Sequence, residues 1–271
     1  MSYTFLLAST TNYGVILAES LLKAGFFCHG VLTPTAQPAG RKKIITKNPV
    51  QIWAEAQNLP IFFVEKKLDQ ALIASLPKID FLLVADFGYY VPEKLTNLAK
   101  YLAVNVHPSA LPKYRGSSPG QAVILNGEKN SAVSLIQVAK EMDAGDLLAQ
   151  IPFQVNQNWN KDQYYDFAFS LAAQSLPQKL LDFAEGKIKL TPQKGEPTFA
   201  LKLDRAAGFI KNIQAEPMLT YRKFLAYHPW PGIWTLDENG KRVKILACHL
   251  DQKKELAIDL IQIEGKTAKK P

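Results

Sequence analysis

An asparagine and a histidine stand two residues apart where an apolar stretch of the chain gives way to a proline-rich one. In an extended chain Asn105 and His107 point to the same face, because side chains alternate along a strand. An amide and an imidazole side by side suit two tasks, donating to a developing oxyanion and moving a proton near neutral pH. Asp143, in a short DxGD turn, is a carboxylate that could orient or charge the imidazole. The residues alone leave a second interpretation open, in which His107 is a hydrogen-bonded structural residue and Asp143 forms a turn.

The elements that must position these side chains alternate between strand-like and helical segments. Apolar runs predict strands at 3–8, 26–32, 61–64, 80–85, 102–106 and 132–138, and helical patterns lie at 15–24, 49–57, 68–76, 92–99, 118–125 and 164–185. This order predicts an α/β fold, an open and mostly parallel Rossmann-like sheet with helices on both faces. Ligands of such sheets bind beyond the carboxyl ends of the strands, which is where Asn105 and His107 lie. Residues 34–49 are expected to form a loop. Because GxGxxG and GxxxxGK[ST] motifs are missing, a dinucleotide oxidoreductase or a P-loop enzyme is not indicated.

The last part of the chain has a different pattern. A helical stretch leads to residue 227, and three short strands are predicted at 232–236, 243–249 and 256–262, with Asn239-Gly240 as a hairpin turn. We expect a small C-terminal domain, β-barrel-like and of a shortened OB type. The expected domains are a catalytic domain at 1–186, a linker at 187–205 and the small domain at 206–271.

Positive charge is concentrated in that last part. Of 271 residues, 32 are Lys or Arg and 24 are Asp or Glu, a net charge of +8. Residues 1–185 contain 16 basic and 15 acidic side chains, whereas residues 186–271 contain 16 and 9, a net of +7. Such asymmetry favours a polyanionic partner such as nucleic acid, and a solvated surface is the alternative.

Composition also limits location and metal chemistry. No stretch approaches the roughly 18 apolar residues of a membrane span, and the N-terminus lacks the basic region of a secretory signal. Two distant cysteines, Cys28 and Cys248, cannot form a disulfide framework or a zinc cluster. We therefore expect a cytoplasmic protein without a membrane anchor and without a metal.

The segment that begins at Asn105 resembles the signature of a known family. It reads Asn105-Val106-His107-Pro108-Ser109-Ala110-Leu111-Pro112-Lys113-Tyr114-Arg115-Gly116, with Asp143 following in its DxGD turn. This pattern resembles that of the 10-formyltetrahydrofolate-dependent formyltransferases, and within that group it is most similar to the methionyl-tRNA formyltransferases. Three other segments support the narrower resemblance: the basic loop from Pro38 to Pro49, the stretch from Gln193 to Lys202, and His228-Pro229-Trp230-Pro231-Gly232. Three departures are Ser9, where the family usually has glycine, Ala110, where it usually has leucine, and the C-terminal module from Arg205 to Pro271, which is shorter than the family's usual barrel.

The resemblance implies a reaction and a set of site residues. Formyl transfer from 10-formyltetrahydrofolate to a free amine would use Asn105 and His107 as donors to the oxyanion, with Asp143 holding His107 in its cationic form. The folate would lie along two segments, whose residues are Ser109, Ala110, Leu111, Pro112, Phe87, Gly88, Tyr89 and Tyr90.

The resemblance also implies a nucleic-acid partner, the acceptor stem of methionyl-tRNA. The basic loop would contact it through Arg41, Lys42, Lys43 and Lys47, although a short basic tract is more often only a solvated surface. A monomer is expected. The alternatives left open are a folate-dependent formyltransferase acting on a sugar nucleotide, one acting on glycinamide ribonucleotide, and a nucleic-acid-binding relative without catalytic activity.

Overall fold

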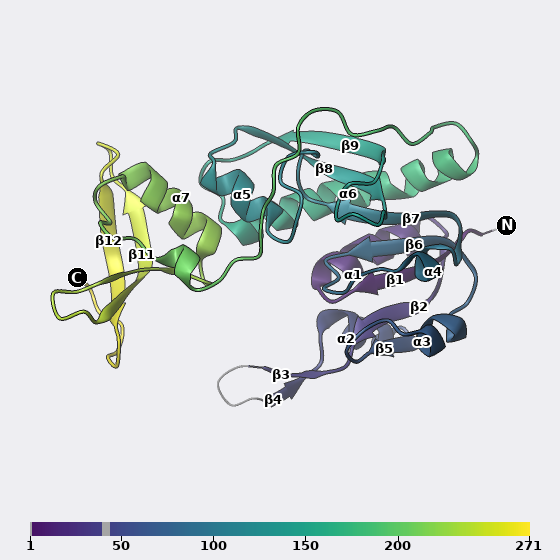
Figure 1. Cartoon of the computed structure of the whole chain (residues 1–271), viewed down its shortest axis with the longest axis horizontal. Helices are drawn as coiled ribbons and strands as arrows, with labels where there is room; N and C mark the ends of the chain where they lie inside the picture. Colours follow the sequence, from purple (N-terminus) through teal and green to yellow (C-terminus); the bar gives the residue numbers. More distant parts are fainter. Residues whose placement is uncertain (1, 40–43) are drawn as a thin grey trace. The chain divides into compact units, whose positions relative to one another are not determined.

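A seven-stranded sheet with the order β5-β2-β1-β6-β7-β8-β9 organises the larger part of the chain (Figure 1). The computed structural model describes residues 2–39 and 44–271. The strands of the sheet are β1 (Thr4–Ser9), β2 (Phe27–Pro34), β5 (Ile61–Val64), β6 (Ile79–Ala85), β7 (Ala99–His107), β8 (Asn130–Gln137) and β9 (Leu147–Gln154). Pairing is parallel from β5 through β7 and antiparallel between β7 and β8. The predicted fold class, an open and mostly parallel Rossmann-like sheet, is confirmed.

Helices lie on both faces of this sheet. The helices that the sequence encodes before the C-terminal region are α1 (Asn12–Lys23), α2 (Pro49–Ala56), α3 (Gln70–Ser75), α4 (Glu93–Thr96), α5 (Pro119–Leu125) and α6 (Lys161–Ala184). Contacts join α1 and α2 to each other and to β2, whereas α3 and α4 pack on the opposite face.

Local signals set the helix boundaries. The Asn48 side chain accepts a hydrogen bond from the Gln51 amide at 3.0 Å and so caps α2. Gly186, with a φ of +74°, follows α6 in the left-handed conformation that glycine tolerates.

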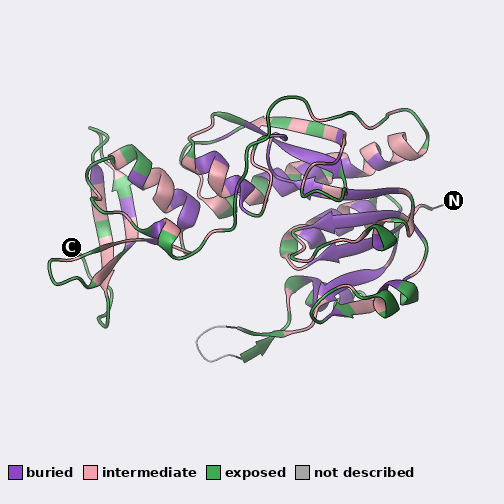
Figure 2. Ribbon diagram, in the orientation of Figure 1, coloured by how far each residue is buried: buried purple, intermediate pink, exposed green. Residues whose placement is uncertain are grey.

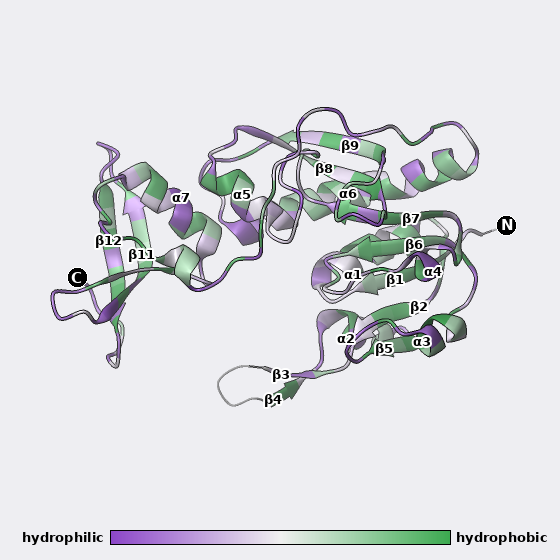
Figure 3. Ribbon diagram, viewed as in Figure 1, coloured by the Kyte–Doolittle hydropathy of each residue, from purple (hydrophilic) through white to green (hydrophobic). Residues whose placement is uncertain are grey.

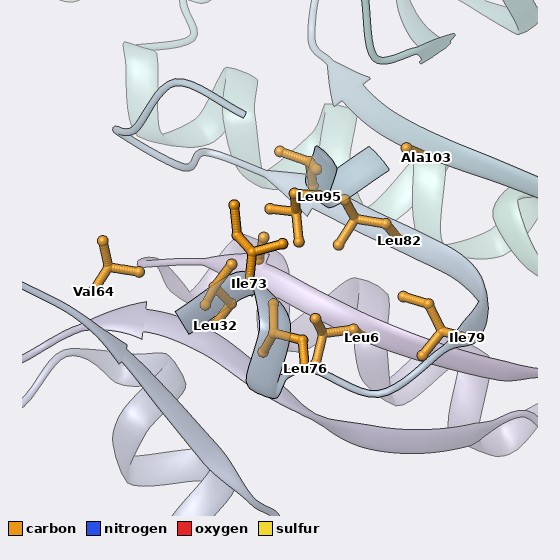
Figure 4. Close-up of a cluster of buried hydrophobic side chains, with 11 residues drawn as sticks. Leu6, Leu32, Val64, Ile73, Leu76, Ile79, Leu82, Leu95 and Ala103 are labelled. Carbon is orange, nitrogen blue, oxygen red and sulfur yellow. The ribbon is translucent and has the colours of Figure 1, made fainter. Parts of the chain in front are cut away.

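The core of the sheet is continuous and apolar. Side chains of β1, β2, β6 and β7 meet those of α3 and α4 in one buried cluster (Figure 4). Within it Leu6, Leu32 and Leu82 have no exposed surface. Fully burying a side chain of this size contributes about 1.5–3 kcal/mol relative to leaving it exposed. The central strands are accordingly buried in Figure 2 and strongly hydrophobic in Figure 3.

Three local expectations were wrong in part. Residues 34–49 are not only a loop, because β3 (Gln37–Ala39) and β4 (Ile44–Thr46) pair as an antiparallel hairpin outside the main sheet. Ile44, Ile45 and Thr46 are all exposed, so no apolar alternation marks this strand. The strand β9 was missed, since it carries Pro152, which a strand at the edge of a sheet tolerates. The helix expected at 92–99 ends at Thr96, and β7 begins three residues later.

The C-terminal region contains α7 (Pro217–Tyr227) and the antiparallel sheet β10 (Ile233–Leu236), β11 (Arg242–Leu250) and β12 (Leu256–Ile263). The three predicted strands are therefore confirmed, and together they form a small three-stranded sheet that packs against α7. The turn between β10 and β11 is closed by Asp237, whose carboxylate accepts from the backbone amides of Asn239 and Lys241.

By compactness the chain divides into two units, each assembled from three segments. The first unit comprises Met1–Pro112, Ala132–Ile151 and Asp166–Glu196, and the second comprises Lys113–Ser131, Pro152–Tyr165 and Pro197–Pro271. The domain boundaries expected at 186 and 206 stay a prediction. Among the helices in the described part of the chain, none has the length and apolar character needed to cross a membrane.

Candidate active site

The predicted site lies at the carboxyl end of β7. This strand runs between β6 and β8, and its last residues carry Asn105 and His107. Asn105 pairs with Val84 on one side, and His107 pairs with Ser134 on the other. Alternation along β7 therefore places both side chains on one face, as the sequence predicts. His107 is only 4% exposed, which keeps its imidazole in a low-dielectric environment.

The structure brings Asp143 to both of these side chains. The Asn105 Nδ2 atom donates a hydrogen bond to Asp143 Oδ1 at 3.3 Å. The His107 Nδ1 atom lies 3.6 Å from Asp143 Oδ2, an ion pair when the ring is protonated. The His107 and Asp143 side chains are 5% and 10% exposed, so the pair is shielded from solvent. Asn105 and His107 therefore both contact the carboxylate of Asp143, so the three predicted catalytic side chains lie together.

A tight loop between β8 and β9 presents that carboxylate. Asp143 has a φ of +53°, an uncommon value that short polar residues tolerate better than others. Two residues later Gly145 lies against the Gln137 carbonyl, and a Cβ atom built on it would come within 1.9 Å of that oxygen. The Gln137 amide in turn donates to the Asp146 carbonyl at 2.8 Å. The loop is thus pressed against the end of β8, which fixes where Asp143 can lie.

A buried hydroxyl holds the segment that follows His107. Ser134 is fully buried on β8, and its Oγ donates to the Ser109 carbonyl at 2.7 Å. The same Oγ accepts from the Leu111 amide and from the Gln150 side chain, at 3.3 and 3.0 Å. Gln150 also donates to the Leu111 carbonyl at 3.0 Å. Sequence reasoning did not identify Ser134 or Gln150, because no motif connects residues on β8 and β9 with the segment after β7.

The residues expected to contact a folate lie on two segments that follow the neighbouring parallel strands β6 and β7. On the first, the Phe87 and Tyr89 rings lie 5.3 Å apart and pack on the apolar cluster, whereas Tyr90 is 66% exposed. On the second, Ser109 and Leu111 are buried and Ala110 is half-buried. The remaining members of the predicted set are the exposed Gly88 and the buried Pro112. Carboxyl ends of adjacent parallel strands share one edge of a sheet, so both segments start beside Asn105.

Ser9, one of the departures from the family pattern, is accommodated by a glycine. Ser9 is fully buried, and a Cβ atom on Gly14 would lie 2.2 Å from its Oγ. The added hydroxymethyl group therefore occupies space that Gly14 leaves at the start of α1.

Of the four basic residues predicted to bind tRNA, Arg41, Lys42 and Lys43 lie outside the described residues. Lys47 is described, and its Nζ donates to both carboxylate oxygens of Glu55 at 2.9 and 2.7 Å. Hydrogen bonds from Lys47 and then from Gln51 lower the pKa of Glu55 below its ordinary value. Lys47 is 51% exposed, so it remains accessible to a polyanion in competition with Glu55.

Both cysteines are buried, and a histidine on the C-terminal sheet is paired with an aspartate. Burial raises the pKa of Cys28 to about 11 and that of Cys248 to about 12, so both thiols stay protonated near neutral pH. His249 binds Asp259 across the C-terminal sheet at 2.8 Å. Within the described residues, no three His, Cys, Asp or Glu side chains gather in a way that could hold a metal ion.

An amide and an imidazole at the end of β7 thus meet a carboxylate of the β8–β9 loop on a Rossmann-like sheet. The family model described as "Formyl transferase" matches residues 5–180, and the chain belongs to that family.

Known proteins resemble the chain over most of its length. It is 33% identical to a methionyl-tRNA formyltransferase of Campylobacter curvus over 94% of this chain and 83% of the relative. Among solved structures it resembles the methionyl-tRNA formyltransferase of Clostridium thermocellum, with a TM-score of 0.62 and 15% identity over 96% of this chain and 98% of that one. It also resembles WlaRD, a sugar 3N-formyl transferase solved in the presence of dTDP and 5-N-formyl-THF, with a TM-score of 0.70 and 16% identity over 98% and 99% of the two chains. Because both identities are low, these structural matches establish the fold alone.

Proposed function

We propose that this chain transfers the formyl group of 10-formyltetrahydrofolate to the free amino group of methionyl-tRNA, in preparation for translation initiation. The observation that carries the proposal is the joint contact of Asn105 and His107 with the carboxylate of Asp143. Identity of 30% or more with several methionyl-tRNA formyltransferases supports the choice of acceptor. A cytoplasmic monomer remains our expectation.

Each of the three side chains has a task in the proposed reaction. When bound, 10-formyltetrahydrofolate supplies an electrophilic formyl carbon. An amide nitrogen carries two hydrogens, so Asn105 can donate one to Asp143 and the other to the negative charge that develops on the formyl oxygen. His107 faces Asp143 through Nδ1, and we assign Nε2 of the protonated ring as a second, charged donor to that oxygen. Asp143 stabilises the cationic ring and takes part in moving the proton from the attacking amine to the leaving nitrogen.

The two segments after β6 and β7 fit a flat, partly aromatic ligand. Phe87 and Tyr89 supply apolar surface, and the segment from Ser109 to Pro112 is held rigid by Ser134 and Gln150. Sites for such ligands are mostly apolar, with a few well-placed polar groups. These segments would hold the folate next to Asn105 and His107.

The nucleic-acid part of the proposal rests on charge. Two features of the sequence favour contact with phosphates of the acceptor stem: the net charge of +7 over residues 186–271 and the basic side chains Arg41, Lys42, Lys43 and Lys47. Electrostatic binding of this kind weakens steeply with salt, with a log–log slope near −0.9 per phosphate contact for duplex DNA as a guide. We expect the KM for methionyl-tRNA to rise several-fold or more between about 50 and about 200 mM salt, and an unchanged KM would contradict this part of the proposal.

A second candidate is a formyltransferase for an amino-sugar nucleotide, because Asn105, His107 and Asp143 would serve formyl transfer to any free amine. The deciding assay incubates the protein with 10-formyltetrahydrofolate and offers methionyl-tRNA, an amino-sugar nucleotide or glycinamide ribonucleotide in separate reactions. Formylation of methionyl-tRNA alone is the expected result, and formylation of another acceptor instead overturns the assignment. If no acceptor is formylated, a binding protein without catalytic activity is indicated.

The same assay tests the three catalytic residues. Removing one donor to an oxyanion typically lowers kcat by about 10²–10³. Asn105→Ala, His107→Ala and Asp143→Ala should each lose activity on this scale while the far-ultraviolet circular dichroism of the protein is retained. Turnover near the wild-type rate in the His107 variant would refute the assignment.

A further inference from the structure

One side chain outside the predicted site touches the loop that carries Asp143 at two points. The Gln193 Nε2 atom donates to the Asp143 carbonyl at 2.8 Å and to the Gly145 carbonyl at 2.8 Å. A glutamine amide nitrogen carries two hydrogens, so both bonds are made by a single group. Gln193 therefore bridges two carbonyls that lie two residues apart on the same loop.

The backbone around Gln193 is itself fixed to the end of this loop. The Leu147 amide donates to the Thr191 carbonyl at 2.8 Å, and the Thr191 amide donates to the Leu147 carbonyl at 2.9 Å. Leu147 is the first residue of β9 and directly follows the Asp143 turn. These two hydrogen bonds fix the backbone at Thr191 against the start of β9. The side-chain amide of Gln193, two residues further on, therefore reaches the loop from a segment whose position is fixed.

The loop needs such support because its conformation is unfavourable by itself. Asp143 has a φ of +53°, in the left-handed region that aspartate enters more readily than most residues but still uncommonly. The loop also has to keep the Asp143 carboxylate within 3.3 Å of Asn105 and 3.6 Å of His107. Hydrogen bonds to the carbonyls on either side of Ala144 hold the peptide planes of this turn, and those planes set the direction of the Asp143 side chain.

We infer that Gln193 is a positioning residue for formyl transfer, which acts by fixing the backbone of the Asp143 loop so that its carboxylate meets Asn105 and His107. The inference rests on the proposed function only in that the reaction uses Asp143. Gln193 lies 50 residues from Asp143 in the sequence, so neither the catalytic motif nor its spacing includes it.

The decisive variants keep the length of the side chain and change its donors. Gln193→Met removes both hydrogen bonds, and Gln193→Glu places a carboxylate against two carbonyl oxygens. We expect kcat to fall about 10- to 100-fold in Gln193→Met and further in Gln193→Glu, with the KM for 10-formyltetrahydrofolate unchanged within about twofold. Gln178→Met is the matched control, because Gln178 is exposed on α6 and its amide donates to Asp182 of the same helix.

A double variant separates positioning from a general loss of stability. If Gln193 acts through Asp143, then Gln193→Met should lower kcat much less in an Asp143→Asn background than in the wild type. Thermal unfolding and active-site titration of each variant correct the rates for the folded fraction. A lower melting temperature with an unchanged kcat per folded molecule, an effect on KM alone, or full additivity with Asp143→Asn would each overturn the inference.

The test does not depend on the identity of the acceptor. It uses whichever acceptor the wild-type protein formylates, so failure with methionyl-tRNA overturns the proposed function and leaves this inference standing. Conversely, Gln193→Met with wild-type kinetics on methionyl-tRNA overturns this inference and leaves the proposed function intact.

Discussion

Adding a single methyl group at Gly145 should disrupt the candidate site and lower the rate of formyl transfer. A methyl group on Gly145 would lie 1.9 Å from the Gln137 carbonyl oxygen and 2.9 Å from its carbon. Real Cβ atoms essentially never come within 3.0 Å of such a neighbour. Gly145→Ala therefore forces the loop or the end of β8 to move by about 1.1 Å or more.

A movement of that size is large on the scale of the site. The Asp143 carboxylate, two residues from Gly145, contacts Asn105 at 3.3 Å and His107 at 3.6 Å. Taken along these contacts, the displacement lengthens both to more than 4 Å and removes the hydrogen bond. Misplacement of a catalytic group by about 1 Å can lower the rate about 10²-fold, and this is the fall in kcat we expect for Gly145→Ala.

The assay is single-turnover formyl transfer at saturating folate, with rates expressed per folded molecule. Gly186→Ala is the control, because Gly186 has a φ of +74° and an added Cβ would meet nothing within 4 Å. That variant should lose about 1 kcal/mol of unfolding free energy from backbone strain and keep its kcat. If Gly145→Ala retains more than about a third of the wild-type kcat, the loop tolerates the displacement, and close packing at Gly145 does not fix the position of the Asp143 carboxylate.

Three other regions give direct tests. Cys28 and Cys248 should resist alkylation near pH 8 until the protein is denatured, because burial raises the pKa of both thiols, and a rapidly reacting thiol in the folded protein would contradict this. Ser134→Ala should cost about 1–3 kcal/mol in urea unfolding and raise the KM for the folate, because the segment after β7 loses its buried donor. Tyr114→Phe removes a 2.7 Å hydrogen bond to Glu128, and this bond lowers the pKa of the Glu128 carboxyl in the folded protein. The bond therefore stabilises the fold above the pKa that Glu128 has in the unfolded chain, and this stabilisation is lost as the pH falls through the folded pKa. That variant should therefore lose about 0.5–1 kcal/mol near pH 7 and much less near pH 3, and equal losses in denaturant unfolding at both would refute it.

The parts of the fold that the sequence predicts best are those that bury a continuous apolar surface. β6 (Ile79–Ala85) is buried over most of its length, so its hydrophobic run clearly predicts a strand. β4 (Ile44–Thr46) has no buried face, and β9 carries a proline, so neither has the pattern by which strands are recognised. The edge strand β5 and the three C-terminal strands were predicted, so position in the sheet alone does not explain the failures. Prediction failed at β4, which has no buried face to select its side chains, and at β9, whose apolar pattern a proline interrupts.

Some features of the candidate site could likewise be predicted from the sequence, and others could not. Asn105 and His107 are predictable because one strand carries both and their separation of two residues follows from its geometry. Asp143 is predicted as a candidate partner of His107 from its carboxylate and its turn, but its contact with Asn105 and His107 depends on the loop between β8 and β9. The order of the sheet places this loop beside β7, and no local pattern in the sequence encodes that order.

Gln193 begins a stretch that supports the family resemblance, but its hydrogen bonds to the Asp143 loop could not be predicted, and the reason is chemical. Its two hydrogen bonds go to backbone carbonyls, which every residue possesses, so its partners leave no trace in residue types. The same holds for Ser134, whose hydroxyl binds the backbone of the segment after His107. Side chains that act on substrate must have particular chemistry, whereas side chains that hold a loop need only a donor in the right place. The support of a catalytic group is therefore visible only once the fold has brought distant backbone segments together, and in this chain that support is where substitutions should separate folding from catalysis.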